Sequence, residues 1–387
     1  MIGSGSSKRK EIRTFRTFTS NIRELADWLK SLDIRHVAIE STGIYWKPIF
    51  NVFDGNFDVI LVNAQHVKNV PGRKTDVKDS EWLCKLCKCG LLSKSFIPPK
   101  VIVHLRESVR YRQKLTQELA NAKNRIIKTL ENANVKLSTV FTDVFGVTAW
   151  TIICKLVAGE TRMAKLMGYI HGRCKSSKED IEKALEGTLE DQDRKILKMM
   201  MEHIRAIDKI IEKLDRDIQD QIKPYQAQVD LLKTIPGVKD LAAASIIAEL
   251  GVDMNQFKDA DHLSAWAGLC PGSNQSAGKI KSSRIRKGNK HVKTTMTQVA
   301  WAISRTKGTY LGAKFRSLVP RRGKKRAVIA VGRKALVISY HILRDNVPFH
   351  ELGVDFLNNL EPDRKAKYYE KRLAELGYHI VMSKKVA

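Results

Sequence analysis

Two long helical segments in the middle of the chain constrain its architecture most. The first begins near Pro98-Pro99, and its apolar residues recur at spacings of 4, 3 and 4: Leu115, Leu119, Ala122 and Ile126. The second repeats that spacing for longer until Pro224 ends it: Met200, Ile204, Ile207, Ile211, Leu214 and Ile218. Such spacing puts the apolar residues on one seam of a helix, and proline cannot continue a helix. The sequence predicts either an antiparallel helical hairpin or a coiled-coil dimer arm.

The segment before these helices alternates helix and strand. Residues 22–32 have helical spacing, 35–39 have the pattern of a short buried strand that ends at Glu40, a helix follows around 46–53, and 57–62 form a second strand. Strands that alternate with helices predict an α/β layer with a largely parallel sheet.

The segment after the helices predicts a mainly helical domain with glycine turns. A Pro236-Gly237 turn leads into a helix of small residues over 241–251. This pattern resembles a helix-hairpin-helix, in which turn amides and a helix N-terminus face a phosphate, although an ordinary helix start has the same signals. We expect four regions, in chain order: an α/β domain (1–98), a helical arm (99–228), a helical domain (229–350) and a tail (351–387).

The charge of the chain is large and unevenly distributed. Its 387 residues include 69 Lys or Arg against 41 Asp or Glu, a formal net charge of +28. Between His262 and Arg344 there are 19 Lys or Arg and no acidic residue, and aromatic residues are interleaved with the cations. A solvated tail would lack those aromatics, so we expect this stretch to fold and to bind a polyanion, namely nucleic acid. The interleaved residues are Trp266, Trp301, Tyr310, Phe315 and Tyr340.

Composition argues against a membrane or secreted protein. No apolar run approaches the roughly 20 residues that span a bilayer, and residues 1–7 are polar and glycine-rich without an apolar core. Six cysteines in a chain this long do not form the pattern of a disulfide framework. We expect a reduced, cytoplasmic protein.

The cysteines and histidines offer weaker signals. Cys84-x-x-Cys87-x-Cys89 suggests zinc, but a structural zinc site takes four ligands and the sequence has no second pair. Reduced helix cysteines are the favoured interpretation. His66 and His104 lie near acidic residues, and the default interpretation is a surface or hydrogen-bonded histidine. The run of methionines at 199–201 is interpreted as seam packing.

Three carboxylates form a candidate metal site. Glu40 follows a predicted strand directly, at the edge where open α/β sheets bind ligands. Asp76 and Asp79 are three residues apart at a predicted helix start, with Thr75 as a possible cap, and so share one face. Acidic residues also favour a first helical turn through the helix dipole, so the spacing alone decides little. Cleavage of a phosphodiester needs Mg²⁺, which prefers carboxylate oxygens.

These carboxylates stand in motifs that resemble a known family. Residues 38–46 (AIESTGIYW), 62–64 (VNA) and 74–79 (KTDVKD) resemble the DEDD transposases of the insertion-sequence-110 family, and the resemblance runs over nearly the whole chain. It implies a nuclease domain similar to the RNase H-like Holliday-junction resolvase fold. It assigns Glu40 to the family's glutamate, and Asp76 and Asp79 to its last two aspartates, as Mg²⁺ ligands.

One position of the family pattern has no counterpart here. The family's first aspartate lies on an opening strand well before the glutamate, whereas Asp27 and Asp33 lie in or just after a predicted helix. Either the sequence begins after that strand, which would end near residues 2–5, or this copy has lost a metal ligand. Catalytic competence depends on which explanation holds.

The basic stretch contains a second motif of the same family. Residues 268–279 (GLCPGSNQSAGK) resemble its serine-bearing signature, which implies that Ser276 attacks DNA covalently. The next residue is often glycine in the family and is Ala277 here. A serine in a glycine-bounded loop is otherwise a turn residue, and chemistry alone allows three rivals to Ser276. These are Ser273, Ser282 and Ser283.

Cations around the serine are candidate phosphate ligands, because they can hold a phosphate and stabilise charge on it. A serine hydroxyl also needs a base or a metal to activate it, which the carboxylate cluster would supply. The predicted nucleic-acid-binding residues are Lys279, Lys281, Arg284, Arg286, Lys287, Lys290, Arg321 and Arg322.

The resemblance also implies partners. In the family a structured RNA bridges two DNAs, so we expect DNA, a structured guide RNA and a homodimer or homotetramer in a bacterial, nucleoid-associated protein. A helix of about 30 residues spans about 45 Å. We therefore expect the arms to mediate dimerisation, and the metal cluster of one protomer to serve Ser276 of its partner.

Three functions are compatible with these features. The predicted one is a transposase or recombinase that uses Mg²⁺ and a serine nucleophile. The alternatives are a metal-dependent DNA junction nuclease in which Ser276 only binds phosphate, and a non-catalytic nucleic-acid-binding remnant.

Overall fold

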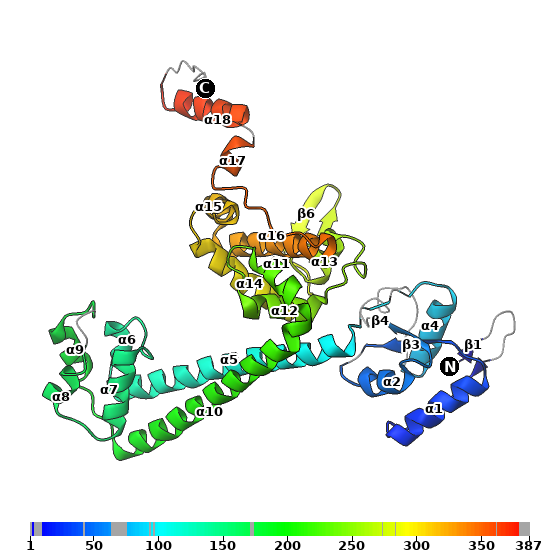
Figure 1. The fold of residues 1–387 in the computed structure, drawn as a ribbon. Helices are drawn as coiled ribbons and strands as arrows, with labels where there is room; N and C mark the ends of the chain where they lie inside the picture. The colour runs from blue at the N-terminus through cyan, green and yellow to red at the C-terminus, as the bar shows by residue number, and fades with distance from the viewer. Residues whose placement is uncertain are drawn as a thin grey trace. The chain divides into compact units, whose positions relative to one another are not determined.

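The chain divides into two compact units, Met1–Pro99 and Lys100–Ala387 (Figure 1). The computed structural model describes residues 2–3, 10–41, 43–62, 76–92, 94–95, 97–170, 174–272, 274–282, 284–360 and 362–378. Within these ranges, the side chains of residues 2, 3, 10, 76–79, 274, 275, 280, 358, 364 and 365 are not described.

The first unit contains the parallel strand pair that the sequence predicts. Strand β3 (His36–Glu40) pairs with β4 (Asp58–Val62), and α2 (Trp46–Phe53) makes the crossover between them. The register runs from His36 opposite Asp58 to Glu40 opposite Val62. A short antiparallel pair, β1 (Ile2–Gly3) and β2 (Lys10–Glu11), lies in the same unit.

Helices pack on both faces of the β3–β4 pair. Helix α1 (Thr19–Ser31) presents Ile22, Ala26 and Leu29 to a core that includes Val59 of β4. Val62 of β4 instead packs with Leu86 of α4 (Asp76–Lys88). Side chains alternate along a strand, so Val59 and Val62 face opposite sides.

The two long helices of the second unit form a hairpin within one chain. Helix α5 (Lys100–Asn132) and helix α10 (Asp191–Ile222) run antiparallel side by side (Figure 1). Arg112 and Asp215 form an ion pair between them. Of the two predicted arrangements, the structure therefore has the intrachain hairpin. The residues buried along it are Leu115, Ala122, Ile126 and Leu130 on α5, and Leu197, Met201, Ile204, Ile207 and Ile218 on α10.

The methionine run at the start of α10 only partly fits the predicted seam. Met201 is buried and Met200 is half-buried against the core of the arm, whereas the side chain of Met199 is 60% exposed.

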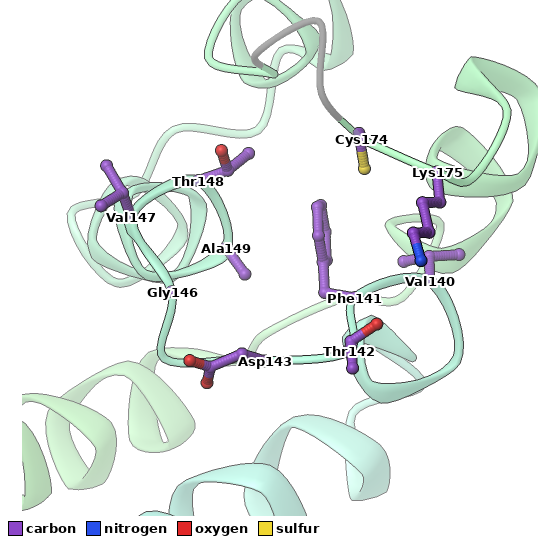
Figure 2. Close-up of a pocket in the computed structure, with 10 residues that line it drawn as sticks. All are labelled: Val140, Phe141, Thr142, Asp143, Gly146, Val147, Thr148, Ala149, Cys174 and Lys175. Carbon is purple, nitrogen blue, oxygen red and sulfur yellow. The ribbon is translucent and has the colours of Figure 1, made fainter. Parts of the chain in front are cut away.

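The connector between the two long helices folds into a small helical subdomain. Its core joins Ile152, Ile153 and Ile181 to the far ends of α5 and α10. A cavity of about 310 Å³ opens there, lined by residues that include Phe141, Cys174 and Lys175 (Figure 2). The sequence reasoning assigned no helix to this connector, whose described residues contain four helices. They are α6 (Leu137–Val140), α7 (Val147–Val157), α8 (Met163–Met167) and α9 (Lys178–Ala184).

A helical bundle follows the arm, as the sequence predicts. A 3₁₀ turn (Lys223–Tyr225) leads into it, and every residue of α12 from Ala243 to Leu250 is buried at its centre. Its helices are α11 (Gln226–Lys233), α12 (Asp240–Leu250), α13 (Ala260–Trp266), α14 (Lys290–Arg305), α15 (Tyr310–Arg322) and α16 (Lys324–Asp345).

The near ends of the arm belong to the core of this bundle. Leu105 and Val109 of α5 and Ile218 and Ile222 of α10 pack with residues of α12, α14 and α16. The arm therefore folds back on itself, and its two ends meet in one core. The length of about 45 Å, on which the expectation of dimerisation through the arms is based, therefore does not separate the two ends of the arm, because the connector reverses the chain.

The segment expected to be a tail begins with residues that pack on the bundle. Phe356 of α17 (Phe356–Asn359) contacts Tyr310 with ring centroids 5.4 Å apart, and Leu357 also packs on the core. Helix α18 (Pro362–Glu375) follows. In the described part of the chain, no helix is both long enough and apolar enough to cross a membrane.

Two isoleucines three residues apart on α10 test the hairpin. Ile207 is 3% exposed and Ile210 is 39% exposed. Ile207→Ala should lower the free energy of unfolding by about 2–5 kcal/mol, because it leaves a cavity in the seam. Ile210→Ala should cost less than about 1 kcal/mol. Urea denaturation measures both. Because the seam lies within one chain, the difference in stability between the two variants should be the same at every protein concentration, and a difference that changes with concentration would contradict the intrachain seam.

Candidate functional site

Glu40 lies at the end of β3, on the sheet face that α4 covers. It pairs in register with Val62, and directly paired residues of neighbouring strands point to the same face. Val62 packs with Leu86 of α4. Glu40 is half-buried and lines a cavity of about 800 Å³ together with Ser80, Cys84 and other residues of α4, β3 and α1.

Helix α4 meets the strands along several of its turns. Burial, then the Cys84 thiol, then the charge of Asp58 raise the pKa of the Cys87 thiol. Asp58 begins β4, where it also pairs with His36 (3.5 Å) and Lys94 (3.0 Å). Leu86, in the last turn of α4, packs on Val62 at the end of β4. Ser80, which follows the first turn of the helix, lines the same cavity as Glu40.

The two predicted aspartates lie in that first turn of α4. The helix begins at Asp76 and continues through Asp79, as the sequence predicts. Their side chains, and the whole of Thr75, lie outside the described residues, so the convergence of three carboxylates stays a prediction. Among described residues, no group of three acidic, cysteine or histidine side chains is placed to hold a metal. The backbone placement and the hard oxygen donors fit Mg²⁺.

Of the other candidate ligands, Cys84 and Cys87 line the same cavity as Glu40. Cys84 and Cys87 are half-buried free thiols on α4, and Cys89, also free, is exposed just after it. His104 is exposed on α5, and His66 lies outside the described residues.

Ser276 lies at the tip of a β-hairpin that the sequence reasoning did not predict. Strand β5 (Asn274–Ser276) pairs antiparallel with β6 (Lys279–Ser282), and Ser276 is directly opposite Lys279. Both residues are exposed. Opposed residues of neighbouring strands have their side chains on the same face, so Ser276 and Lys279 share one face of the hairpin.

The turn of this hairpin has two residues with positive φ. Ala277 has φ 49° and Gly278 has φ 74°. Positive φ at both positions is typical of the tight turns that match the twist of paired strands. Glycine takes this conformation freely, whereas alanine is strained there by about 1–2 kcal/mol. Ala277, the residue directly after Ser276, therefore has a strained backbone conformation.

Close backbone contacts close the base of the hairpin loop. A Cβ on Gly268 would lie 2.8 Å from the carbonyl oxygen of Arg286, and one on Gly288 would lie 2.3 Å from the nitrogen of Gly268. Between this contact of Gly268 with Gly288 and the tip of the hairpin, the amide of Gly272 donates a hydrogen bond to the carbonyl oxygen of Arg284 at 2.9 Å. The loop is thus an ordered projection from the bundle.

The predicted cations of the loop are exposed to solvent. Of the rival nucleophiles, Ser282 is half-buried, and its hydroxyl accepts a hydrogen bond from the backbone amide of Arg284 at 3.2 Å. Ser273 and Ser283 lie outside the described residues. The exposed cations are Lys279, Lys281, Arg284, Arg286, Lys287 and Lys290.

Arg321 and Arg322 belong to a second basic cluster. They end α15, and Gly323 (φ 76°) connects them to three further cations in the first turn of α16. All five side chains are exposed. Cations at a helix N-terminus oppose the helix dipole, so an anion would stabilise this corner. The three further cations are Lys324, Lys325 and Arg326.

The Pro236-Gly237 turn is packed against the bundle. A Cβ on Gly237 would lie 3.0 Å from the backbone nitrogen of Ile303. The first turn of α12 carries Asp240, whose carboxylate pairs with Lys233 at 2.6 Å. An acidic side chain there disfavours a phosphate, so the phosphate-binding role predicted for this turn gains no support from these contacts.

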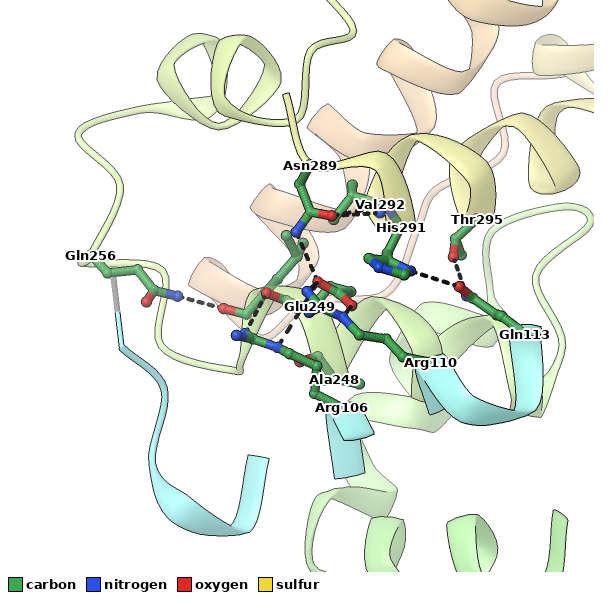
Figure 3. A network of polar contacts seen from close by, with 11 residues as sticks. Arg106, Arg110, Gln113, Ala248, Glu249, Gln256, Asn289, His291, Val292 and Thr295 are labelled. Atoms are coloured by element: carbon green, nitrogen blue, oxygen red, sulfur yellow. Dashed lines mark hydrogen bonds and ion pairs between the residues drawn. The ribbon is translucent and has the colours of Figure 1, made fainter. Parts of the chain in front are cut away.

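A buried polar network anchors the helix that follows the loop (Figure 3). Glu249 of α12 is 1% exposed. It accepts two hydrogen bonds from Arg110 of α5 (2.7 and 2.8 Å) and one from Asn289 (2.8 Å). The Asn289 side chain also caps α14, because its oxygen accepts hydrogen bonds from the backbone amides of His291 (2.9 Å) and Val292 (3.3 Å). One carboxylate thus joins α5, α12 and the start of α14.

Arg106 and His291 complete the network. The Arg106 guanidinium donates to the backbone carbonyls of Ala248 (2.8 Å) and Glu249 (2.9 Å). Burial would raise the pKa of Glu249, but Arg110, Asn289 and Arg106 outweigh it and hold the pKa below its ordinary value of 4.5. Burial, and then the charge of Arg110, lower the pKa of His291. The network thus favours an ionised glutamate beside a neutral histidine.

The sequence contains one signal for this network that we did not use. Glu249 is the only charged residue in the run from Leu241 to Gly251. A lone charge in an apolar helix is seldom buried unless it is paired. Its partner Arg110 is 139 residues away, so only the tertiary structure identifies it.

Comparison with known proteins places the chain in a family. A model of DEDD transposases of the IS110 type matches residues 4–135, and the model described as "Transposase IS116/IS110/IS902 family" matches residues 229–316. The chain belongs to the IS110-type transposase family. This confirms the resemblance carried by the two motifs. The first match contains Glu40, Asp76 and Asp79, and the second contains Ser276.

Three relatives cover parts of this transposase-family chain. The pilin gene-inverting proteins of Moraxella bovis and Moraxella lacunata are each 33% identical over 156 residues, which is 38% of this chain and 48% of the relative. The insertion element IS900 uncharacterized 42 kDa protein of Mycobacterium paratuberculosis is 24% identical over 158 residues, 40% of this chain and 39% of the relative. The chain thus spans about half the length of each Moraxella protein.

Glu249→Gln tests the buried network. It should lower the free energy of unfolding near pH 7 by about 3–5 kcal/mol, because Arg110 is left without its counter-charge. The pKa of Glu249 is depressed, so its contribution is present above about pH 4.5 and is lost as the pH falls through the depressed value. The difference between wild type and variant should therefore shrink below pH 4.5.

Urea denaturation at several pH values measures this difference. Glu212→Gln, at an exposed position of α10, is the matched control and should change stability by less than about 0.5 kcal/mol. Equal effects of the two substitutions would show that Glu249 is not a structural anchor.

Proposed function

We propose that this chain is a DNA transposase or recombinase that cleaves and rejoins DNA strands with Ser276 as the nucleophile. In this proposal Glu40, Asp76 and Asp79 hold Mg²⁺, and a structured RNA guides the reaction. The observation that carries it is Ser276 itself, exposed at the tip of an anchored hairpin, opposite Lys279 and within the family match of 229–316. A relative named as gene-inverting supports strand exchange as the reaction class.

The chemistry divides between the chain's two units. Ser276 Oγ attacks a phosphorus atom of DNA, an Oγ–P bond forms, and the P–O bond to the leaving strand breaks. Lys279 stands where its ammonium can hold the phosphate and offset developing negative charge. Attack by a strand-end hydroxyl on the serine-linked phosphate rejoins DNA and frees Ser276. Mg²⁺ bound by the carboxylates would activate an attacking oxygen and stabilise a leaving one.

The position of Glu40 supports the metal site. It lies on the α4 face of the sheet, and the first turn of α4 carries Asp76 and Asp79. We also infer an RNase H-like fold for the first unit, from the parallel β3–β4 pair and from the DEDD match over 4–135. The guide RNA and a dimer or tetramer remain part of the proposal. The seam of the arm is filled within one chain, so dimerisation would use another surface.

A covalent adduct tests the nucleophile. Incubation with labelled DNA and Mg²⁺, followed by denaturing electrophoresis, should reveal a protein–DNA adduct. Ser276→Ala should abolish that adduct, whereas Ser282→Ala, at the rival serine of the same hairpin, should retain it. Asp79→Asn should reduce cleavage at least about 100-fold while DNA affinity changes less than about 2-fold, because one carboxylate changes little of a +28 charge.

Two outcomes would overturn the assignment. Cleavage by Ser276→Ala at the wild-type rate would favour a metal-dependent junction nuclease in which the serine only binds phosphate. DNA binding without cleavage, by a folded wild-type chain supplied with Mg²⁺ and its own guide RNA, would favour a non-catalytic remnant.

The salt dependence of DNA affinity tests whether the cations of the second unit bind DNA. If 6 to 10 phosphates are contacted, DNA affinity should fall by roughly 10³ to 10⁵ between about 50 and 200 mM salt, because binding releases counterions. Fluorescence anisotropy measures this slope. Lys279→Ala should flatten the slope by about one unit, whereas Lys213→Ala, on the arm, should not change it. A flat salt response of the wild type would exclude the basic bundle as the DNA surface.

A further inference from the structure

Trp301 is a large aromatic residue exposed in the middle of the basic bundle. Its side chain is 39% exposed, on the third turn of α14. Part of the indole packs on Phe315 of α15, with ring centroids 6.4 Å apart at 57°. The contact with Phe315 restricts the indole, while the exposed part offers an aromatic surface to solvent.

The helix face that carries Trp301 is basic. Lys290 lies 11 residues before it and Arg305 four residues after it, both exposed. Spacings of 11 and 4 return to the same side of a helix with 3.6 residues per turn. On α15, exposed Arg322 lies seven residues beyond Phe315, about two turns along. The helix face that carries the indole therefore carries two cations, and α15, on which the indole packs, carries a third.

Between the cations, this face carries short polar side chains rather than acids. Thr294 and Thr297 donate their hydroxyls to backbone carbonyls of their own helix, those of Lys290 (2.8 Å) and Lys293 (2.7 Å). Acidic residues are absent from the sequence between His262 and Arg344. The face thus suits a phosphate backbone.

Helix α14 is the next element of the chain after the hairpin that carries Ser276. It begins at Lys290, directly after the loop. At 1.5 Å per residue, Trp301 lies about 16 Å along the helix from that start.

We propose that Trp301 is a stacking platform for an unpaired base of single-stranded DNA, held in place by the cations of α14 and α15. Aromatic side chains in basic grooves bind single strands because every base has a π-face, whereas the bases of a duplex are already stacked. This inference deepens the proposed function, because strands opened for exchange have unpaired bases beside Ser276. It concerns binding alone, so it can be tested apart from cleavage.

The test compares affinities of the full chain for three labelled probes at one salt concentration. The probes are a single-stranded DNA oligonucleotide, its duplex, and a single strand of equal length with abasic sugars. Trp301→Ala should weaken binding of the base-containing single strand by about 5-fold to 150-fold. Binding of the duplex and of the abasic strand should change less than about 2-fold, because their phosphate contacts are intact.

Two further variants separate stacking from packing. Trp301→Leu keeps an apolar contact with Phe315 but has no ring, and should lose single-strand affinity like Trp301→Ala. Trp301→Tyr should retain most of it. Tyr111→Ala, at an aromatic residue 48% exposed on α5, is the matched control and should leave all affinities unchanged. Thermal unfolding of each variant identifies any that fail to fold.

Several outcomes would overturn the proposal. Equal losses on the base-containing and abasic strands, or no loss with Trp301→Ala, would exclude stacking. Full affinity in Trp301→Leu would assign the residue a packing role. A loss seen with single-stranded RNA of the same sequence but not with DNA would exclude DNA as the ligand. The probes report binding alone, so failure of the cleavage test leaves these results interpretable.

Discussion

The carboxylate of Glu249 holds together the part of the second unit that presents Ser276. A buried charge is costly unless it is fully paired, and Arg110, Arg106 and Asn289 supply that pairing. Only one register of α5, α12 and α14 brings these groups together. Asn289 is also the N-cap residue of α14. Gly288, directly before it, is in close backbone contact with Gly268. The position of the hairpin relative to the bundle therefore depends on an ion pair that stands outside the proposed chemistry.

The helical bundle that this network stabilises carries a large positive charge. In the described part of the bundle, Arg333 and Arg344 pair with Asp261 and Asp345, which flank the acid-free stretch. The cations of the hairpin and of the α15–α16 corner are exposed and repel one another. Such a surface gains free energy when a polyanion binds and counterions leave. Ser276 and Trp301 both belong to this acid-free stretch.

The arm has a different role from the one that its length suggests. Its apolar seam is filled by its own two helices, and the connector adds a separate core at the far end. Both near ends are built into the bundle through residues such as Leu105 and Ile222. The helices therefore form a rigid projection of the second unit. Both ends of the arm lie in one core. The length of the arm therefore does not require the carboxylates of a partner to act on Ser276.

The sequence by itself determined the strands at Glu40 and Val62, the helix starting at Asp76, the long helices bounded by prolines, and the basic stretch. Each is local, because periodicity, caps and charge act over a few residues. Motif resemblance, confirmed by the family match, selected Ser276, although nothing in its neighbours predicted a hairpin. Only the tertiary structure decided that the seams pair within one chain, that Glu249 meets Arg110 139 residues away, and that Trp301 is left exposed. These outcomes depend on which surfaces meet, and a long-range contact leaves no periodic trace in the sequence.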